Sequence, residues 1–300
     1  MTHERFISVK FSLLLGLIFL CSPIGARGLQ HFLGVSLAGV EANIIGENLK
    51  SQVGGGGQAL FNYEFAYKAF FVNVGVGADY QLTQGKLMSF IESKQMTDIS
   101  GEPMEYQYRF EQYQEKQTIL YGMFQILLGT KLSPNFYLQA GTHIRCAINK
   151  TYTTQANLFT TGAYSRWAGE FIANVPSYGF YPSDSYHGGG DIRDLRVTIA
   201  PIVEFGYLVP LSRKADLRIA LFGEYAFPMN NEQSLSIVDY SQVNMDVRTW
   251  SQADLQRNLK FHSVLDSSIL PSWGNLEIGV KVSFLFDVTN YKVPCHCMNE

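Results

Sequence analysis

Long segments of this sequence alternate apolar and polar residues one by one, which is the pattern of a β-strand whose two faces meet different surroundings. Residues 276–286 show it most clearly, because every even-numbered residue there is apolar. Residues 136–149 repeat the pattern. Strands in soluble sheets usually have about 5 to 6 residues. The alternation therefore predicts strands that are longer than those of most soluble proteins.

Eight such segments can be placed along the chain, and the connections between them alternate between short and long. The segments are residues 31–44, 58–68, 70–82, 117–130, 136–149, 194–210, 215–227 and 276–286. Tight turns are expected near 68–70, 132–135 and 212–215, and long connections at 45–57, 83–116, 150–193 and 228–272. Short turns on one side and long loops on the other are typical of outer-membrane barrels. The sequence thus predicts an all-β fold: an antiparallel, up-and-down, eight-stranded transmembrane β-barrel with short periplasmic turns and long extracellular loops.

Composition excludes several other classes of protein. Charged residues make up 16% of the chain and aromatic residues 14%, whereas disordered chains and coiled coils are richer in charge and poorer in aromatics. A net charge of -3 argues against a nucleic-acid partner, which needs a basic surface. The longest apolar run, residues 11–21, is too short for a transmembrane helix of about 20 residues. Lipid-facing strands would give the 17 Tyr and 21 Phe an apolar surface.

The first 26 residues have the features of a secretory signal peptide. Arg5 and Lys10 precede the apolar run, and small residues, among them Gly25, follow it. A short buried helix is the alternative interpretation. Lipidation of Cys21 is disfavoured, because Leu20 occupies a position where such sites prefer a small residue. The expected division of the chain is a signal peptide at 1–26, a barrel at 29–287 and a periplasmic C-terminal tail at 288–300.

The polar faces of the segments are expected to fill the inside of the barrel. An eight-stranded barrel is only wide enough for side chains or one small ligand, and buried charges need partners. The inward positions carry six cations and six anions, which predicts an interlocked ion-pair network without a wide pore. A narrow, gated conductance through this network is the alternative. The cations are Lys68, Lys131, Arg145, Arg196, Arg218 and Lys281, and the anions are Glu64, Asp79, Glu204, Glu224, Glu277 and Asp287.

No residue pattern predicts a catalytic, cofactor or metal site. His143 is expected to point inward near Arg145, where it could act as an acid or base in a lipid-modifying enzyme. No serine nucleophile motif accompanies it, so we expect it to belong to the polar network. Residues Cys295–Cys297 supply too few ligands for a soft metal, and a mixed disulfide or an inert tail are the other interpretations. Cys146 is expected on the lipid-facing side, far from the tail.

The long connections hold more than a third of the residues after the signal peptide, and they are the best candidates for function. Tyr106, Tyr108, Phe110 and Tyr113 are interspersed with polar residues. This spacing indicates either a hairpin that continues above the membrane or a contact surface. A second aromatic group occurs at 164–186. Both groups could instead pack on their neighbours and plug the barrel mouth. We expect any surface ligand or envelope protein to bind through these loops.

The pattern as a whole resembles eight-stranded outer-membrane barrels, in particular the OmpA-like transmembrane barrels and the PorT-like barrel family. The resemblance covers nearly all of residues 29–287 and rests on the pattern, not on a residue motif. It implies that Phe284 and Phe286, at the end of the final strand, form the signal that the outer-membrane barrel assembly machinery reads. It also implies a location in the outer membrane of a Gram-negative bacterium, in contact with its lipid.

The function expected from these observations is that of an integral outer-membrane β-barrel protein with a structural or surface-binding role. Its interior is filled by charges, and it is expected to have no enzymatic activity. Both termini are expected in the periplasm. A component of a secretion or surface-assembly system, which the PorT-like resemblance implies, is one alternative. An outer-membrane lipid-modifying enzyme or a narrow channel is the other.

Overall fold

The structure is a computed structural model, and it describes residues 29–98, 100–167, 171–175, 180–182, 184–229, 235–239 and 260–289. The predicted signal peptide at 1–26, Cys295, Cys297 and most of the predicted tail lie outside these residues. Over the described ranges, no helix is both long and apolar enough to cross a membrane. Most of the described residues belong to β-strands.

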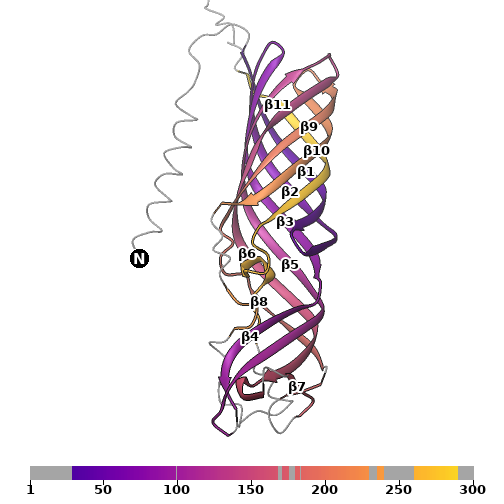
Figure 1. Cartoon of the computed structure of the whole chain (residues 1–300). Coiled ribbons are helices and arrows are strands. Elements are labelled where there is room, and N and C mark those ends of the chain that lie inside the picture. Colours follow the sequence, from indigo (N-terminus) through magenta and orange to yellow (C-terminus); the bar gives the residue numbers. More distant parts are fainter. Residues whose placement is uncertain are drawn as a thin grey trace, which may run out of the picture.

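Eight strands pair into one closed antiparallel ring (Figure 1). Each strand of the ring pairs with the ring strands before and after it in the chain, and β1 pairs with β11 to close the ring. The predicted all-β, antiparallel, eight-stranded architecture is therefore confirmed. The strands of the ring are β1 (Leu29–Gly46), β2 (Leu49–Tyr67), β3 (Phe70–Leu87), β5 (Pro103–Lys131), β6 (Phe136–Ala163), β9 (Val197–Ser212), β10 (Ala215–Pro228) and β11 (Trp273–Asp287).

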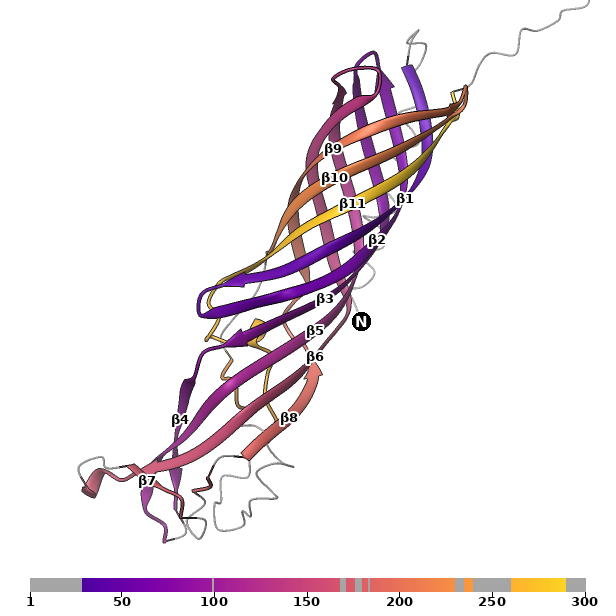
Figure 2. The same cartoon turned by 90° about the vertical axis from the view of Figure 1, so that its right-hand side faces the viewer.

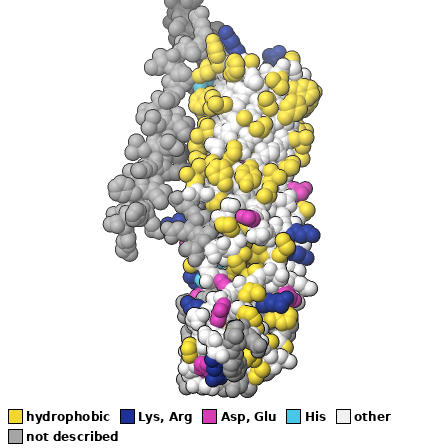
Figure 3. All heavy atoms as spheres, viewed as in Figure 1, with side chains coloured by type: hydrophobic (Ala, Val, Ile, Leu, Met, Phe, Trp, Pro, Cys, Tyr) yellow, Lys and Arg dark blue, Asp and Glu magenta, His cyan; other side chains and the backbone are white. Residues whose placement is uncertain are grey.

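Residues along each strand alternate between the inside and the outside of the ring. In β11, Glu277 and Lys281 are buried inside, whereas Phe284 and Phe286 are exposed outside. The alternation also turns Phe61 of β2 outward, where 70% of it is exposed. On the face that Figure 3 shows, hydrophobic side chains gather over the ring and charged side chains lie mostly toward the other end of the molecule. The two-residue period thus separates an apolar outer surface from a more polar interior.

The connection predicted at 45–57 is not a long loop. β1 and β2 are joined by a tight turn at Glu47 and Asn48, and the four glycines Gly54–Gly57 lie inside β2. Asn48 has a φ of 63°, in the left-handed region that asparagine tolerates. Consecutive glycines are typical of loops, but Gly54 is required here by a close approach of strands. A Cβ atom at Gly54 would lie 2.8 Å from the carbonyl oxygen of Ala42.

Two strands of the ring continue well beyond it, because β5 has 29 residues and β6 has 28 (Figure 2). Beyond the ring, β4 (Phe90–Thr97) pairs with β5, and β7 (Phe171–Ala173) and β8 (Asp184–Asp191) pair with β6. We call β4, β7, β8, residues 103–115 and residues 151–163 the extension. The prediction of long loops at 83–116 and 150–193 is therefore largely wrong, because the pairing of β5 with β6 continues past the ring. The alternative of a continued hairpin is the one that the structure shows.

A β-bulge in β5 keeps the aromatic residues of the extension on its inner side. The pairing of β5 with β6 shifts between Glu111 and Gln114, and Gln112 within this bulge has a φ of 53°. Before the bulge even-numbered residues such as Phe110 are buried, and after it odd-numbered residues such as Tyr113 are buried. The extra residue changes which side chains point inward. Tyr106, Tyr108, Phe110 and Tyr113 therefore lie on one continuous inner face, although the last two are three residues apart and not two.

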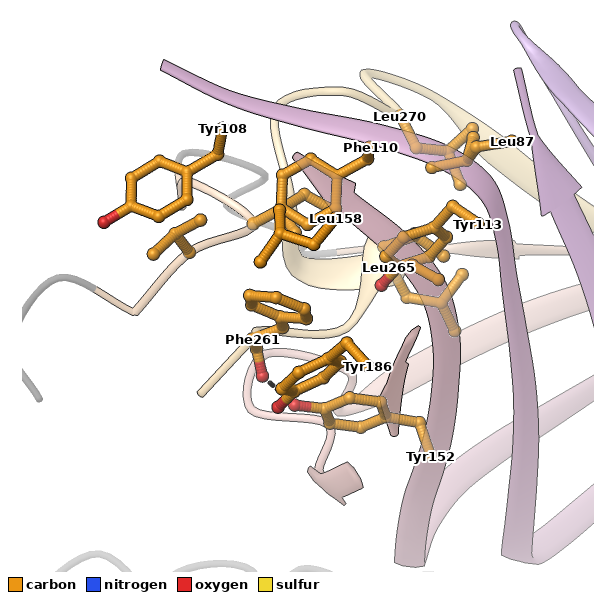
Figure 4. Close-up of a cluster of buried hydrophobic side chains, with 14 of the residues drawn as sticks. Leu87, Tyr108, Phe110, Tyr113, Tyr152, Leu158, Tyr186, Phe261, Leu265 and Leu270 are labelled. Carbon is orange, nitrogen blue, oxygen red and sulfur yellow. Dashed lines mark hydrogen bonds between the residues drawn. The ribbon is translucent and has the colours of Figure 1, made fainter. Parts of the chain in front are cut away.

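The inner side of the extension is a core of aromatic side chains (Figure 4). Phe110 stacks on Phe90 with ring centres 4.6 Å apart, and it meets Phe261 edge-on at 5.2 Å. Tyr186 of β8 lies 4.1 Å from Phe261, ring centre to ring centre. Tyr152 of β6 donates a hydrogen bond to the carbonyl oxygen of Phe261. Residues 260–270, which precede β11, are therefore packed into the extension, and we call this segment the cap.

Candidate functional site

Two ion pairs lie inside the ring near the end that carries the short turns. Nη1 and Nη2 of Arg218 each lie 2.6 Å from one carboxylate oxygen of Glu64, and Lys281 pairs with Glu204. Tyr137 donates a 2.7 Å hydrogen bond to Glu204, and its ring lies 5.0 Å from the guanidinium of Arg218. We call this group the Arg218 tier. Its two cations balance its two anions, so it forms a neutral, buried network.

A layer of uncharged amides adjoins the Arg218 tier. Nε2 of Gln125 donates to Oδ1 of Asn62 at 3.1 Å and to Oδ1 of Asn73 at 2.6 Å. Asn73 in turn donates to Glu64 at 3.4 Å, which joins this amide layer to the Arg218 tier. A cavity of about 10 Å³ lies among these side chains, and this is the space of about one water molecule. The interior here is filled by side chains.

Three carboxylates surround Arg145 on the other side of the amide layer. Nε of Arg145 lies 3.0 Å from Asp79 and Nη1 lies 2.5 Å from Glu277, while Nη2 pairs with Glu224. The ring of Tyr121 lies 5.9 Å from the guanidinium. All four charged side chains are buried. This Arg145 tier holds one cation against three anions, so it differs from the Arg218 tier in carrying excess negative charge.

His143 connects the Arg145 tier to the amide layer. Its Nδ1 lies 2.6 Å from Oε2 of Glu224, and its Nε2 lies 3.1 Å from Oε1 of Gln125. The side chain is buried inside the ring. An acid or base that acts on membrane lipid would have to reach the outer surface of the ring. His143 is instead bonded on both sides within the interior.

The interior does not contain every charge that the sequence pattern assigned to it. Lys68 lies in the turn between β2 and β3 with a φ of 56° and is exposed, and Arg196 is exposed just before β9. Lys131 and Asp287 are half-buried at strand ends. The alternating pattern predicts an inward side chain at every second residue, but at the ends of a strand such a side chain can still reach the surface. Among the described residues, the charges buried in the ring are Arg145, Arg218 and Lys281 against Glu64, Asp79, Glu204, Glu224 and Glu277, so the expected balance of six to six does not hold.

One buried carboxylate of the extension, Glu115, holds the cap in place. Glu115 accepts hydrogen bonds from the hydroxyl of Ser263 at 2.6 Å and from the amide of Val264 at 3.0 Å. Tyr113 and Gln117 donate to it from β5 at 3.0 and 2.8 Å. Burial raises the pKa of Glu115 above its ordinary value. Tyr113, Glu115, Ser263 and Val264 were predicted in long loops, so this contact was not expected. The change of parity at the bulge places Tyr113 and Glu115 on one inner face.

Two further carboxylates hold the surroundings of the cap through backbone amides. Asp266, in the short 3-10 helix η4 (Val264–Asp266), accepts from the amides of residues 193 and 194 at 2.7 and 3.0 Å. Glu92 of β4 accepts from the amides of residues 237 and 238 at 2.8 and 2.9 Å. Burial raises the pKa of both carboxyl groups. Acidic side chains therefore fix the position of segments that lack regular secondary structure.

The outer surface of the ring carries the remaining residues of interest. Phe284 and Phe286 are exposed near the end of β11. Cys146 of β6 is exposed, whereas Cys295 and Cys297 lie outside the described residues. These outward residues do not touch the polar interior.

Comparisons with known proteins give remote structural similarity only. No family model matches the sequence, and no curated protein matches it closely. The chain is similar to the attachment invasion locus protein Ail of Yersinia pestis in complex with the heparin analogue sucrose octasulfate, with 10% identity over 86% of this chain and 99% of Ail and a TM-score of 0.29. A deletion mutant of the monoaromatic hydrocarbon channel TodX has 9% identity over 88% of this chain and 91% of TodX, with a TM-score of 0.20. Function is therefore inferred from the residues of this chain.

Proposed function

We propose that this chain is an integral outer-membrane β-barrel protein of a Gram-negative bacterium, in which a sealed ring anchors an extension with a structural or surface-binding role. The observation that carries the proposal is a reversal of polarity along β5 and β6. In the ring the outward residues are apolar, as at Leu128, which is 63% exposed. In the extension the outward residues are polar, as at Arg109 and Thr153. Lipid suits the first surface and water the second.

The size of the ring supports a membrane location. Six of its strands have 14 to 19 residues, and a tilted strand needs about 9 to 11 to cross the apolar layer. A closed ring also pairs the backbone groups that lipid could not satisfy. The exposed apolar surface includes Leu33, Leu37, Phe61, Phe70, Val203, Phe205, Leu221, Ile278 and Val280.

The filled interior supports an anchor in preference to a channel or an enzyme. Side chains occupy the ring from the Arg218 tier to the Arg145 tier, and Leu265 and Leu270 of the cap belong to one buried cluster with Ile44 and Leu87 of the ring strands. His143, the residue considered for lipid chemistry, is bonded within this interior. We therefore assign the protein no catalytic role and no cofactor, and we place its interactions on the extension.

The two chain ends support the expected assembly route. β1 begins and β11 ends on the same side of the ring, since Phe32 pairs with Asp287. The short turns after β2, β5 and β9 lie on this side, which would be periplasmic, with the extension outside the cell. Phe284 and Phe286 then face lipid at the end of the final strand, where the barrel assembly machinery would read them.

Cysteine labelling tests the membrane location directly. A chain that lacks residues 1–26 and carries Cys295→Ser and Cys297→Ser has Cys146 as its remaining thiol. Refolded in lipid vesicles and labelled with a polarity-sensitive fluorophore, it should emit as in an apolar medium and be quenched by quenchers attached to lipid. The matched control replaces Cys146 with Ser and Thr153 with Cys, and its label should emit as in water. Water-like emission from both positions would contradict the proposal.

Site-specific cross-linking tests the surface-binding role. A photoactivatable amino acid at Gln107, on the outer side of the extension, should capture an envelope protein or surface ligand on living cells. The same amino acid at Phe61, on the outer side of the ring, should capture lipid instead. Equal protein capture at both positions would place the partner around the barrel and not on the extension. No capture at Gln107 would leave the extension with a purely structural role.

A further inference from the structure

Three lysines lie on neighbouring strands where the ring meets the extension. Lys50 of β2 is directly opposite Lys86 of β3. Lys116 of β5 is directly opposite Gln84, which precedes Lys86 by two residues on the same strand. Lys50 and Lys116 are exposed, and Lys86 is half-buried. The strand register therefore places the three lysines in one row across the sheet, and we call them the lysine row.

The lysine row lies on the outer face of the sheet. Leu87, next to Lys86, is buried, and so is Glu115, next to Lys116. Because successive residues of a strand point to opposite faces, Lys86 and Lys116 point outward. Residues directly opposite each other on antiparallel strands share a face, so Lys50 points outward with Lys86.

The lysine row comes just after the apolar outer surface of the ring ends. Along β3 the outward residues are Tyr80, Leu82, Gln84 and then Lys86. Lys86 therefore lies four residues beyond Leu82, which is roughly 9 Å across the membrane for a tilted strand. The headgroup layer extends about 5 to 7 Å beyond the apolar layer, and a long lysine stem can reach back toward it along apolar surface. Figure 3 shows basic side chains on the extension side of the hydrophobic band.

Within the described residues, the lysine row has no anionic partner. None of its ammonium groups forms an ion pair there. Apart from the two lysines that face each other, the residues directly opposite the row are Gln84, Gln114 and Thr153. Like charges directly opposite on neighbouring strands are unfavourable, so the row is a site of uncompensated positive charge. The amides and the hydroxyl beside it can donate further hydrogen bonds to an anion.

We propose that the lysine row binds the phosphate of a lipid headgroup in the outer leaflet, an inference that rests on the proposed outer-membrane location. Lysine binds phosphate as a point charge, and basic clusters beside a membrane attract anionic lipids. The apolar surface next to the row, which includes Tyr80 with 45% of it exposed, would receive the acyl chains of the same molecule. A soluble anion would meet the charge and leave this apolar surface unused, so the occupant is a lipid.

Native mass spectrometry of the folded protein in neutral detergent micelles tests the proposal. The probe is phosphatidic acid, whose headgroup is a phosphate, and the reference is phosphatidylcholine with the same acyl chains. The parent chain should bind phosphatidic acid in preference. Each lysine near a membrane surface contributes about a fivefold gain in affinity. Replacing Lys50, Lys86 and Lys116 together with Gln should therefore weaken the binding of phosphatidic acid about a hundredfold and leave that of phosphatidylcholine unchanged.

The matched control removes three exposed cations of the extension, Lys94, Arg109 and Arg166, by the same change to Gln. It should bind phosphatidic acid as the parent chain does. An equal loss in both triple variants would assign the binding to net charge and overturn the proposal, as would unchanged binding when the lysine row is replaced. Excess inorganic phosphate should not release the lipid, and release would identify a site for soluble anions instead. The membrane location is decided separately, by the labelling of Cys146.

Lys86→Gln alone gives a second measurement, in which the sign of the effect depends on the lipid. In neutral detergent this variant should raise the urea midpoint, because it removes one of two like charges that face each other. In vesicles of phosphatidylcholine with phosphatidic acid it should lower the midpoint, because the parent chain is then stabilised by the bound headgroup. If the parent chain and the variant ranked in the same order in both media, the lysine row would not be a lipid site.

Discussion

The ring and the extension are built on the same two strands with opposite polarity. Within the ring, β5 and β6 turn Gln125 and Arg145 inward and Leu128 outward. Within the extension, the same strands turn Phe110 inward and Arg109 outward. The parity of the buried residues changes at the bulge around Gln112. The outward residues of β5 change from polar to apolar further along the strand, between Thr118 and Leu120.

The comparison shows that the surroundings, and not the strand, decide which side chains are buried. In the membrane location that we propose, lipid lets the ring turn apolar residues outward and close its interior with ion pairs and hydrogen bonds. An extension in water needs an apolar core for its stability. The two regions should therefore respond differently to the same kind of substitution.

The largest expected effect comes from the only guanidinium of the Arg145 tier. Arg145→Met leaves Asp79, Glu224 and Glu277 buried without their cation, and breaking a buried ion pair on one side costs about 3 to 5 kcal/mol. The whole ring should be affected, as measured by urea unfolding followed through the mobility of folded and unfolded forms on a detergent gel.

Arg109→Met is the matched control for that substitution. Arg109 also pairs with a carboxylate, Glu111, at 3.0 Å, but 56% of its side chain is exposed. Exposed ion pairs contribute about 0 to 1 kcal/mol. If the two substitutions had similar effects on the unfolding midpoint, the difference between the ring interior and the outer face of the extension would be lost.

A substitution in the aromatic core should separate the two regions. Phe110→Ala removes a fully buried ring that contacts Phe90 and Phe261, at a cost of about 3 kcal/mol. We expect the extension to become sensitive to protease while the ring keeps its folded mobility on the gel. Phe159→Ala, a half-buried residue on the outer side of β6, is the control and should remain resistant. Loss of the folded ring in Phe110→Ala would show that the two regions unfold together.

The cap offers an intermediate effect and a pH dependence. Glu115→Ala leaves the donors of Ser263 and Val264 without their acceptor and should weaken the cap by about 2 kcal/mol. Burial raises the pKa of Glu115, so the folded chain binds its proton more tightly than the unfolded chain. Stability of the cap is therefore greatest in acid and is lost as the pH rises through the raised pKa.

Hydrogen exchange of the Val264 amide, corrected for the intrinsic effect of pH, measures this dependence. Glu115→Gln keeps the shape of the side chain and removes its titration, so protection of Val264 should depend less on pH than in the parent chain. Glu92 and Asp266 also have raised pKa values and supply the remaining dependence. If the protection of the Val264 amide changed with pH equally in the parent chain and in Glu115→Gln, Glu115 would be excluded as the titrating group.

The ring was predictable because its strands follow a simple two-residue pattern. Every even-numbered residue of 276–286 is apolar. Over this range of β11 the even-numbered residues lie on the outer face and the odd-numbered residues on the inner face. The position of His143 inside the ring follows from the same alternation. Its contacts with Glu224 and Gln125 do not, because they are made with residues on two other strands.

The extension and the cap were less predictable because they depend on distant contacts. Glu115 meets Ser263, which lies 148 residues later in the chain, and neither residue belongs to a repeating pattern that would indicate the contact. The length of β5 was misjudged for a related reason. The parity of β5 changes at a bulge and its outward residues change from polar to apolar further along, so a single alternating pattern does not cover the strand.

The smallest expected effect concerns Lys68 and Arg196, which share the inward parity of the network but lie at exposed positions. Lys68→Ser and Arg196→Ser should each change the free energy of unfolding by less than about 0.5 kcal/mol, as is usual for surface sites. Lys281→Met is the contrasting substitution, because Lys281 is buried against Glu204 and its loss leaves that carboxylate unpaired. The urea midpoints of the three variants show whether a charged residue contributes to the interior network only where its side chain is buried, or wherever the alternating pattern points it inward. If Lys68→Ser or Arg196→Ser destabilised the ring as much as Lys281→Met, the interior would extend to the strand ends, and its charge balance would have to be counted again.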